Sequence, residues 1–249
     1  MHKNICLEVE YLGTNYYGFQ LQDKVGKREI TVQEVLERAI RKLFKQKIRI
    51  AYASRTDRGV HAKGQVVNFK VDTIIPLKNI KNALNTFLPP DVRVKKVKIA
   101  PDDFHARFKA KSKLYRYIIL NKAEPTVFSS NFSWHVAKPL DISKMVRISK
   151  KLKGIKDFSI FAKEPSTYET CIRNLKSISI KKSKGFINID LQASGFLRNM
   201  ARNIVAFLVR VGSGGLSLKE SAQILKKKKP YANKPAPAHG LCLIKVNYA

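Results

Sequence analysis

The order of predicted secondary structure repeats once along this chain of 249 residues. The first half reads strand, helix, strand, strand, helix, strand, on the basis of two-residue alternation in the strands and helical periodicity in the helices. Its predicted strands are 5–11, 48–54, 64–71 and 92–99, and its predicted helices are 32–44 and 77–88. This is the β-α-β-β-α-β order of the ferredoxin-like or RRM-like unit.

The second half follows the same order with one helix added near its end. Its strands are predicted over 113–120, 173–181, 185–192 and 241–247, and its helices over 141–153, 196–211 and 217–227. We therefore predict an α+β fold of two ferredoxin-like units, 1–104 and 105–249. Side by side, they would form one extended antiparallel sheet with helices on one face and a central cleft for an active site.

The charge of the chain favours a polyanionic partner. Lys and Arg total 49 against 18 Asp and Glu, for a net charge of +31, and a field of this size attracts nucleic acid or anionic lipid. The basic residues are spread along the whole chain, up to the run Lys226 to Lys229, which is predicted to end a helix. RNA is favoured over a membrane because no amphipathic anchor collects the charge, and RRM-like sheets present side chains to unstacked bases.

Cysteine usage and hydropathy argue against zinc-binding, disulfide-rich, secreted and membrane proteins. Cys6, Cys171 and Cys242 are far apart and include no CxxC pair, so we expect neither a zinc site nor a disulfide framework. The apolar stretch Ile204 to Val211 is too short to span a bilayer, and Glu8 interrupts any N-terminal signal sequence. We expect a cytoplasmic protein without a membrane anchor.

The segment from Ser54 to Ala62, sequence SRTDRGVHA, connects two predicted strands and has two interpretations. Asp57, Arg58 and Gly59 are typical of a turn in which Gly59 takes a positive φ. A turn does not require Arg55 or His61 beside the carboxylate, however, and loops on rigid strands often present catalytic groups. The residues alone leave both interpretations open.

Six segments, in the right order, resemble motifs of the TruA-type pseudouridine synthases. The segment around Asp57 resembles the catalytic motif RTDxGVHA. The others are YLGT…YGFQLQ from Tyr11, TVQE from Thr31, FHARF…KLYRY from Phe104, FLRNMARNIV from Phe196 and APAHGL from Ala236. The chain departs from the family pattern at Arg58, where alanine is usual, and also at Ser54, Leu12 and Phe19.

The resemblance implies roles for particular residues. Asp57 is implied as the essential carboxylate, a nucleophile toward C6 or C1′ or a base toward the ribose, and Arg202 as its salt-bridge partner across the cleft. Tyr115 is implied to stack on the flipped uracil, although two tyrosines alternating with Arg116 are also typical of a core strand. Substrate binding is assigned to Tyr115, Arg55 and Arg107. It is also assigned to Arg58, a departure from the family that either adds a phosphate contact or is merely tolerated, and to His61, which is interpreted as a hydrogen-bonding or RNA-contacting residue.

The resemblance also implies a partner and a reaction. We expect isomerisation of uridine to pseudouridine in the anticodon stem-loop of tRNA, at positions 38, 39 and 40, by a homodimer that needs no cofactor and no metal. The alternative is a non-catalytic RNA-binding protein with two RRM-like units. That alternative explains the charge and the fold, but it does not explain the Asp57 motif, and the aromatic RNP motifs that it requires are absent. A DNA-binding function is not favoured, because the sequence contains no recognisable groove-reading helix module.

Overall fold

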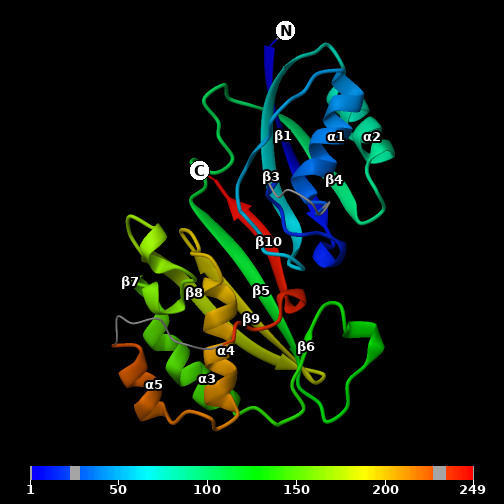
Figure 1. Ribbon diagram of the computed structural model, residues 1–249. Coiled ribbons are helices and arrows are strands. Elements are labelled where there is room, and N and C mark those ends of the chain that lie inside the picture. The colour runs from blue at the N-terminus through cyan, green and yellow to red at the C-terminus, as the bar shows by residue number, and fades with distance from the viewer. Residues whose placement is uncertain (1, 23–28, 227–233, 249) are drawn as a thin grey trace. The chain divides into compact units, whose positions relative to one another are not determined.

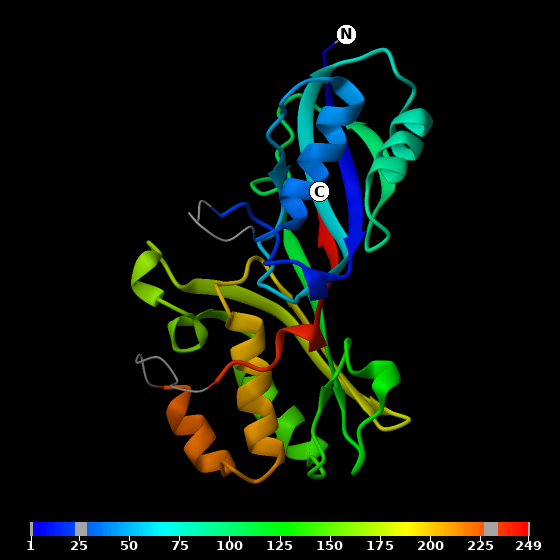
Figure 2. The same ribbon diagram turned by 45° about the vertical axis from the view of Figure 1, so that its right-hand side comes forward.

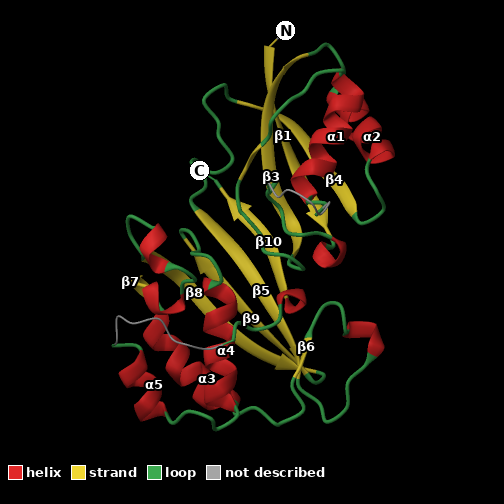
Figure 3. Cartoon of the chain, in the orientation of Figure 1, coloured by secondary structure: helices red, strands yellow, loops and turns green. Residues whose placement is uncertain are grey.

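The computed structural model describes residues 2–22, 29–226 and 234–248 (Figure 1). The fold is α+β, as predicted, with a mixed β-sheet and five α-helices among the described residues (Figure 3). The chain divides into two compact units, Met1–Lys111 with Leu243–Ala249, and Ser112–Cys242. Whether each unit is RRM-like stays a prediction.

The strands of the first unit follow the spatial order β4, β1, β3, β10, with β2 pairing to β3; β10 belongs to this unit from Leu243 on. Their bounds are Val92–Ala100 for β4, His2–Tyr11 for β1, His61–Asp72 for β3, Leu241–Asn247 for β10 and Ala51–Tyr52 for β2. Strand β1 is antiparallel to both neighbours, and Ile5 lies opposite Phe69 on β3 and Ile99 on β4.

Helices α1 (Val32–Phe44) and α2 (Leu77–Phe87) lie side by side in this unit (Figures 1 and 2). Ile5, Leu7 and Val9 alternate along β1 and are completely buried, which is the pattern of a strand face that packs on helices. Asn4 points to the opposite face, where its amide donates to the carbonyls of Pro101 and Phe104. Residues 101–111, which cross the predicted boundary, are thereby tied to the first unit.

Helix α1 begins at Val32, as predicted, but Thr31 and Glu34, whose spacing predicts a capping box, form only one of its two bonds. The Thr31 hydroxyl accepts a hydrogen bond of 3.3 Å from the backbone N–H of Glu34, which satisfies one of the unpaired donors of the first turn. The carboxylate of Glu34 pairs with Arg38 one turn later. The reciprocal bond of a full capping box is found in the second unit, where Ser217 and Glu220 cap α5 (Leu218–Ile224).

The strands of the second unit follow the order β5, β9, β8, β7. Their bounds are Ser112–Leu120 for β5, Phe186–Ala193 for β9, Ile172–Ser183 for β8 and Gly154–Asp157 for β7. Strand β6 (Trp134–His135) runs parallel to β5. The prediction of a wholly antiparallel sheet is therefore wrong. A long connection between the end of β5 and the start of β6 brings β6 beside β5 in the same direction.

Two further helices complete the second unit, α3 (Ile142–Ser149) and α4 (Met200–Gly212). Helix α4 is apolar and buried on most of its surface, so it is a core helix of this unit. It begins four residues later than predicted, because Asn199 has a φ of 63° and is left-handed. Helix α3 ends at Ser149 and continues as a 3-10 turn to Leu152.

Several boundaries differ from the sequence prediction. The short strands β6 and β7 were not predicted, and the predicted strand 48–54 is regular only at Ala51–Tyr52. The lysine run predicted to end a helix lies, from residue 227 on, outside the described residues. No helix in the described part of the chain is long and apolar enough to cross a bilayer.

Candidate active site

Residues 54–61, which we call the Asp57 loop, connect β2 to β3 in the first unit. Ser54 and Thr56 are buried, whereas Arg55 and Arg58 are exposed and Asp57 is half-buried. Alternation of buried and exposed side chains continues the period of a strand into an irregular segment. The loop therefore has an anchored inner side and an outer side that presents two arginines.

Asp57 begins a β-turn. The Val60 N–H donates to the Asp57 carbonyl at 3.1 Å, and Gly59 has a φ of 79°. The predicted turn, with Gly59 at positive φ, is confirmed. Because the turn leaves the Asp57 side chain half-exposed, this finding is compatible with the catalytic interpretation of the same residues.

The entry to the loop is held by Gln65 on β3. This side chain is completely buried; its amide donates to the Ser54 carbonyl at 2.7 Å, and its oxygen accepts from the Ser54 N–H at 3.2 Å. A buried amide is stable when its donors and acceptors are satisfied. Sequence analysis missed Gln65, although a polar residue directly before the apolar run Val66-Val67 is a signal for such an anchor.

The middle of the loop is held by residues 11–19, which we call the clamp segment. The Tyr11 hydroxyl and Thr56 Oγ1 are 2.8 Å apart, and the Phe19 N–H donates to the Thr56 carbonyl at 3.1 Å. Gly18 has a φ of 92°, and a Cβ there would lie 2.8 Å from the Thr56 carbonyl oxygen. Position 18 therefore requires glycine.

The exit of the loop is held by His61, the first residue of β3. Its Nδ1 accepts a hydrogen bond of 3.0 Å from the Gly13 N–H, and the residue as a whole is 4% exposed. A Cβ at Gly13 would lie 2.1 Å from the Val60 carbonyl oxygen. The backbones of the clamp segment and the loop are thus in direct contact at this end.

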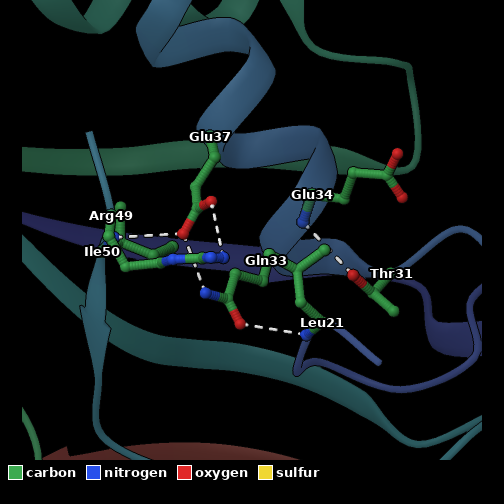
Figure 4. A network of polar contacts seen from close by, with 7 residues as sticks. All are labelled: Leu21, Thr31, Gln33, Glu34, Glu37, Arg49 and Ile50. Carbon is green, nitrogen blue, oxygen red and sulfur yellow. Dashed lines mark hydrogen bonds and ion pairs between the residues drawn. The ribbon is translucent and has the colours of Figure 1, made fainter. Parts of the chain in front are cut away.

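Helix α1 anchors the clamp segment in turn. The N–H groups of Val32 and Gln33 donate to the carbonyls of Gly18 and Phe19 at 3.2 and 2.9 Å, so the unpaired donors of the helix start find partners. Figure 4 shows the Gln33 side chain between the Leu21 N–H, at 3.0 Å, and the Glu37 carboxylate, at 2.8 Å.

The Glu37 carboxylate extends this network to the segment before β2. It also accepts from the Ile50 N–H at 3.2 Å and from Arg49 at 3.3 Å (Figure 4). One helix turn thereby connects the clamp segment to the strand that enters the Asp57 loop. This is the structural role of the TVQE motif at Thr31.

Two arginines of the loop lie on its outer side. The Arg58 guanidinium stacks on the Tyr17 ring, with its central carbon 4.1 Å from the ring centroid. Arg55 is exposed. Both positions suit contact with phosphate, because guanidinium groups bind phosphate oxygens in fork geometry.

Arg107 lies on residues 101–111 of the same unit. Its neighbour Phe108 is 75% exposed and stacks on His105, with ring centroids 4.3 Å apart, and the Arg107 guanidinium lies 5.8 Å from the Phe108 centroid. The Ala106 N–H donates to the buried Asn68 side chain at 2.8 Å. An aromatic ring on an anchored turn beside a cation is the arrangement that stacks nucleic-acid bases.

In the second unit, Tyr115 lies on β5 opposite Leu191. It is 4% exposed, and its ring packs edge-on against Phe196 at a centroid distance of 4.9 Å. Tyr117 is completely buried on the same face, and its hydroxyl donates to the Pro237 carbonyl at 2.8 Å. Burial raises the pKa of Tyr117, an effect that the positive charge of Arg202 partly opposes.

Arg202 lies in the first turn of α4. Its Nε donates to the Ala236 carbonyl at 2.7 Å, and its own carbonyl accepts from the Ala236 N–H at 3.3 Å. Asn199 Oδ1 lies 3.5 Å from one terminal nitrogen. The contacts with Ala236 and Asn199 constrain the orientation of the guanidinium.

The structure therefore brings four predicted site residues, Arg55, Asp57, Arg58 and His61, onto one loop. Arg107 occupies a separate segment of the first unit, and Tyr115 and Arg202 belong to the second unit, so the Asp57–Arg202 pair stays a prediction. Within the described ranges, no group of three or more His, Cys, Asp or Glu side chains is arranged to hold a metal ion.

Comparison with known proteins decides the family. The model of the tRNA pseudouridine synthase family matches residues 8–109 and 148–249. The tRNA pseudouridine synthase A of Thermoanaerobacter sp. (strain X514) is 44% identical over 247 residues, which cover 99% of this chain and 100% of the relative. That of Acetivibrio thermocellus is 40% identical with the same coverage. The chain belongs to the tRNA pseudouridine synthase family, TruA type.

This result confirms the family predicted from the six motifs, and with it the isomerase class. Within the TruA-type chain, the two matched ranges contain the Asp57 loop, Arg107 and Arg202, whereas Tyr115 lies between them. The tRNA pseudouridine synthase A 2 of Clostridium perfringens is likewise 40% identical, over 251 residues.

Proposed function

We propose that this protein converts uridine to pseudouridine in the anticodon stem-loop of tRNA, at positions 38, 39 and 40. It acts in the cytoplasm as a homodimer and without a cofactor. The observation that carries the proposal is the Asp57 loop of a TruA-type chain. It presents a half-buried carboxylate between two outward arginines and holds the residues around it by buried hydrogen bonds.

The reaction is an isomerisation in which atoms balance without a second substrate. The bond between C1′ and N1 of the uridine breaks, the uracil turns, and a bond from C1′ to C5 forms. The C5 proton leaves to solvent and N1 takes up a proton. Because nothing is oxidised or reduced, side chains with acid–base and nucleophilic chemistry suffice.

Asp57 is the essential carboxylate of this scheme, as a nucleophile toward C6 or C1′ or as a base toward the ribose. Each role requires it to be ionised beside an uncharged uracil from which water has been removed. Removal of water disfavours the charged carboxylate, whereas a nearby guanidinium favours it. We assign that guanidinium to Arg202. Its support is the anchoring of the half-buried Arg202 side chain by Ala236 and Asn199.

Substrate contacts are assigned to residues on both units. Arg55 and Arg58 on the outer side of the Asp57 loop contact phosphates around the flipped uridine, and Arg107 with Phe108 contacts RNA farther along. Tyr115 stacks on the uracil, with Phe196 holding its ring. Extrusion of the base costs a few kcal/mol, which such contacts repay.

The net charge of +31 supports tRNA as the partner, because each phosphate neutralised by Lys or Arg releases condensed counterions. The same charge is also expected of a non-catalytic RNA-binding protein. The Asp57 loop favours the enzyme, because RNA binding by itself does not require a carboxylate between two arginines.

Pseudouridine mapping in tRNA from cells lacking this protein tests the proposal. We expect loss of pseudouridine at positions 38 to 40, restored by the wild-type gene and not by one encoding Asp57→Asn. Unchanged pseudouridine at all three positions contradicts the substrate assignment. A protein that binds tRNA but restores no pseudouridine is the RNA-binding protein of the alternative.

A further inference from the structure

The two peptide planes on either side of Asp57 are held by hydrogen bonds, one from the clamp segment and one from within the turn of the loop itself. The peptide between Thr56 and Asp57 is held through its carbonyl by the Phe19 N–H at 3.1 Å, and the peptide between Asp57 and Arg58 is held through its carbonyl by the Val60 N–H at 3.1 Å. Peptide planes are rigid, so fixing both leaves the Asp57 side chain only its own two torsions.

We infer that Tyr11 and His61 are positioning residues for Asp57: they fix the loop that carries the carboxylate and act on the reaction through it. This inference rests on the proposed function. Tyr11 acts on the residue before Asp57 through the 2.8 Å contact with Thr56 Oγ1. His61 acts on the end of the loop through the 3.0 Å hydrogen bond from Gly13.

The protonation of His61 follows from its partner. Nδ1 accepts a hydrogen bond from a backbone N–H, so it carries no proton, and the proton of a neutral imidazole is then on Nε2. The residue is 4% exposed, so its ring belongs to the interior contacts of the loop. Of the two roles predicted for His61, hydrogen bonding and RNA contact, the bond from Gly13 supports the first.

Tyr11 also occupies an internal position. It is 3% exposed, and its ring lies 6.0 Å from that of Phe19. Its hydroxyl meets another buried hydroxyl, on Thr56, which is 7% exposed. Loss of a hydrogen bond by a buried hydroxyl costs free energy, so this contact constrains both side chains. The contact thus constrains the rotamer of Thr56 and the position of the loop relative to the end of β1.

The clamp segment can act as a template because it is itself held from two sides. Helix α1 binds its Gly18 and Phe19 carbonyls, and the Tyr16 hydroxyl donates to the Asp91 carboxylate at 2.5 Å. A displacement of about 1 Å in a catalytic group lowers rates by roughly a hundredfold. Rigid support of this kind is what a positioning role requires.

The first experiment removes the hydroxyl contact from either partner. Tyr11→Phe and Thr56→Val each delete one hydroxyl at nearly constant volume, and tritium release from C5-labelled uridine in tRNA gives kcat and KM. We expect each variant to lower kcat by about ten- to a hundredfold, with KM within about twofold. The double variant should lose no more than the worse single one, because both changes remove the same contact.

The second experiment separates the two nitrogens of His61. The amide oxygen of His61→Asn can occupy the position of Nδ1, whereas the amide of His61→Gln reaches the position of Nε2. We expect His61→Asn to retain most of the wild-type kcat and His61→Gln to lose about as much as Tyr11→Phe. The inference is overturned if His61→Gln retains the wild-type kcat and His61→Asn loses it. It is also overturned if either variant has a raised KM with unchanged kcat, because His61 then contacts RNA.

A control and a second measurement separate positioning from stability. Asn85→Ala removes two hydrogen bonds to Val94, of 3.0 and 2.8 Å, in the same unit and between residues outside both the loop and the clamp segment; it should lower stability and leave kcat unchanged. Amide hydrogen exchange over residues 54–61 should rise in Tyr11→Phe and His61→Gln.

The two measurements fail in different ways. A wild-type protein that releases no tritium refutes the proposed function, while the exchange rates still test the clamp. Exchange at residues 54–61 that is unchanged in both variants refutes the positioning role whatever the activity. A fully active Tyr11→Phe variant beside an active wild type also refutes the positioning role.

Discussion

The central carbon of the Arg58 guanidinium lies 4.1 Å from the centroid of the Tyr17 ring. The side chain that follows Asp57 is thereby held over an aromatic face on the clamp segment. A stacked guanidinium keeps its edge free to donate to phosphate. The motif that this segment resembles usually has alanine at this position, so Arg58 is a departure from it.

We expect Arg58→Ala to weaken tRNA binding and to make the salt dependence of log Kd shallower by about one, since about one phosphate contact is lost. Tyr17→Leu should weaken binding by roughly two- to fivefold, because a cation–π contact contributes about 0.5–1 kcal/mol. Binding titrations over a series of salt concentrations measure both effects. Arg38→Ala, which removes equal charge from α1, is the control; an equal change of slope there would contradict a specific contact.

Gly13→Ala should distort the Asp57 loop. The added Cβ would lie 2.1 Å from the Val60 carbonyl oxygen, a backbone atom that cannot turn away. We expect a loss of roughly 1–3 kcal/mol in the free energy of unfolding, the usual cost of overpacking, together with a lower kcat.

Gly195→Ala is the matched control for Gly13→Ala. The nearest atoms to its new Cβ are those of the Arg173 side chain at 3.7 Å, an ordinary contact. Urea denaturation of both variants measures the difference. Equal stability of Gly13→Ala and wild type would show that the clamp segment and the loop are not in the contact described.

Stability in acid should depend on Asp141, which caps helix α3. The hydrogen bond from the Lys144 N–H, followed by that from the Ser143 hydroxyl, lowers the pKa of Asp141 from 3.8 to about 2. A carboxylate with a depressed folded-state pKa contributes stability above its unfolded pKa and loses that contribution as the pH falls through the folded value. The window therefore runs from about pH 4 down to about pH 2.

Asp141→Asn keeps a capping oxygen that does not titrate. The stability difference between wild type and Asp141→Asn should be constant above pH 5 and should shrink as the pH falls toward 2. Urea denaturation at several pH values measures it. A difference independent of pH would contradict the assignment of the shifted carboxyl.

Arg202→Ala should lower kcat by about 10²–10³-fold, the usual cost of removing one preorganised electrostatic group, with tRNA affinity changed much less. Arg202→Lys should restore little, because the ammonium lacks the Nε donor that Ala236 accepts at 2.7 Å. Arg210→Ala, which removes the same charge from the last turn of α4, is the control for the loss of charge. Full activity of Arg202→Ala under single-turnover conditions would exclude its pairing with Asp57 in catalysis.

Much of this fold could be predicted from local sequence. Alternation predicts β1, and the Thr31 cap with the apolar spacing after it predicts α1. The turn at Asp57 and the positive φ of Gly59 also follow from composition. The strands β6 and β7 escape prediction because two or four residues cannot display a period. The start of α4 was misplaced because left-handed Asn199 interrupts a helical pattern that continues on both sides of it.

The contacts that hold the Asp57 loop could not be predicted in this way. Tyr11 and Thr56 are 45 residues apart, and Gly13 and His61 are 48 residues apart. Local patterns carry no information about which distant groups meet. Sequence motifs marked both segments, but the hydrogen bonds that join them depend on the pairing of β1 with β3.

Tritium release from C5-labelled uridine in tRNA, under single-turnover conditions with Asp57→Asn beside the wild type, tests the central claim most directly. The substitution keeps the size of the side chain and removes its charge. We predict release by the wild type and none above background by Asp57→Asn, with tRNA affinity within about threefold, because the phosphate contacts remain. Release by Asp57→Asn at a rate close to that of the wild type would contradict the account.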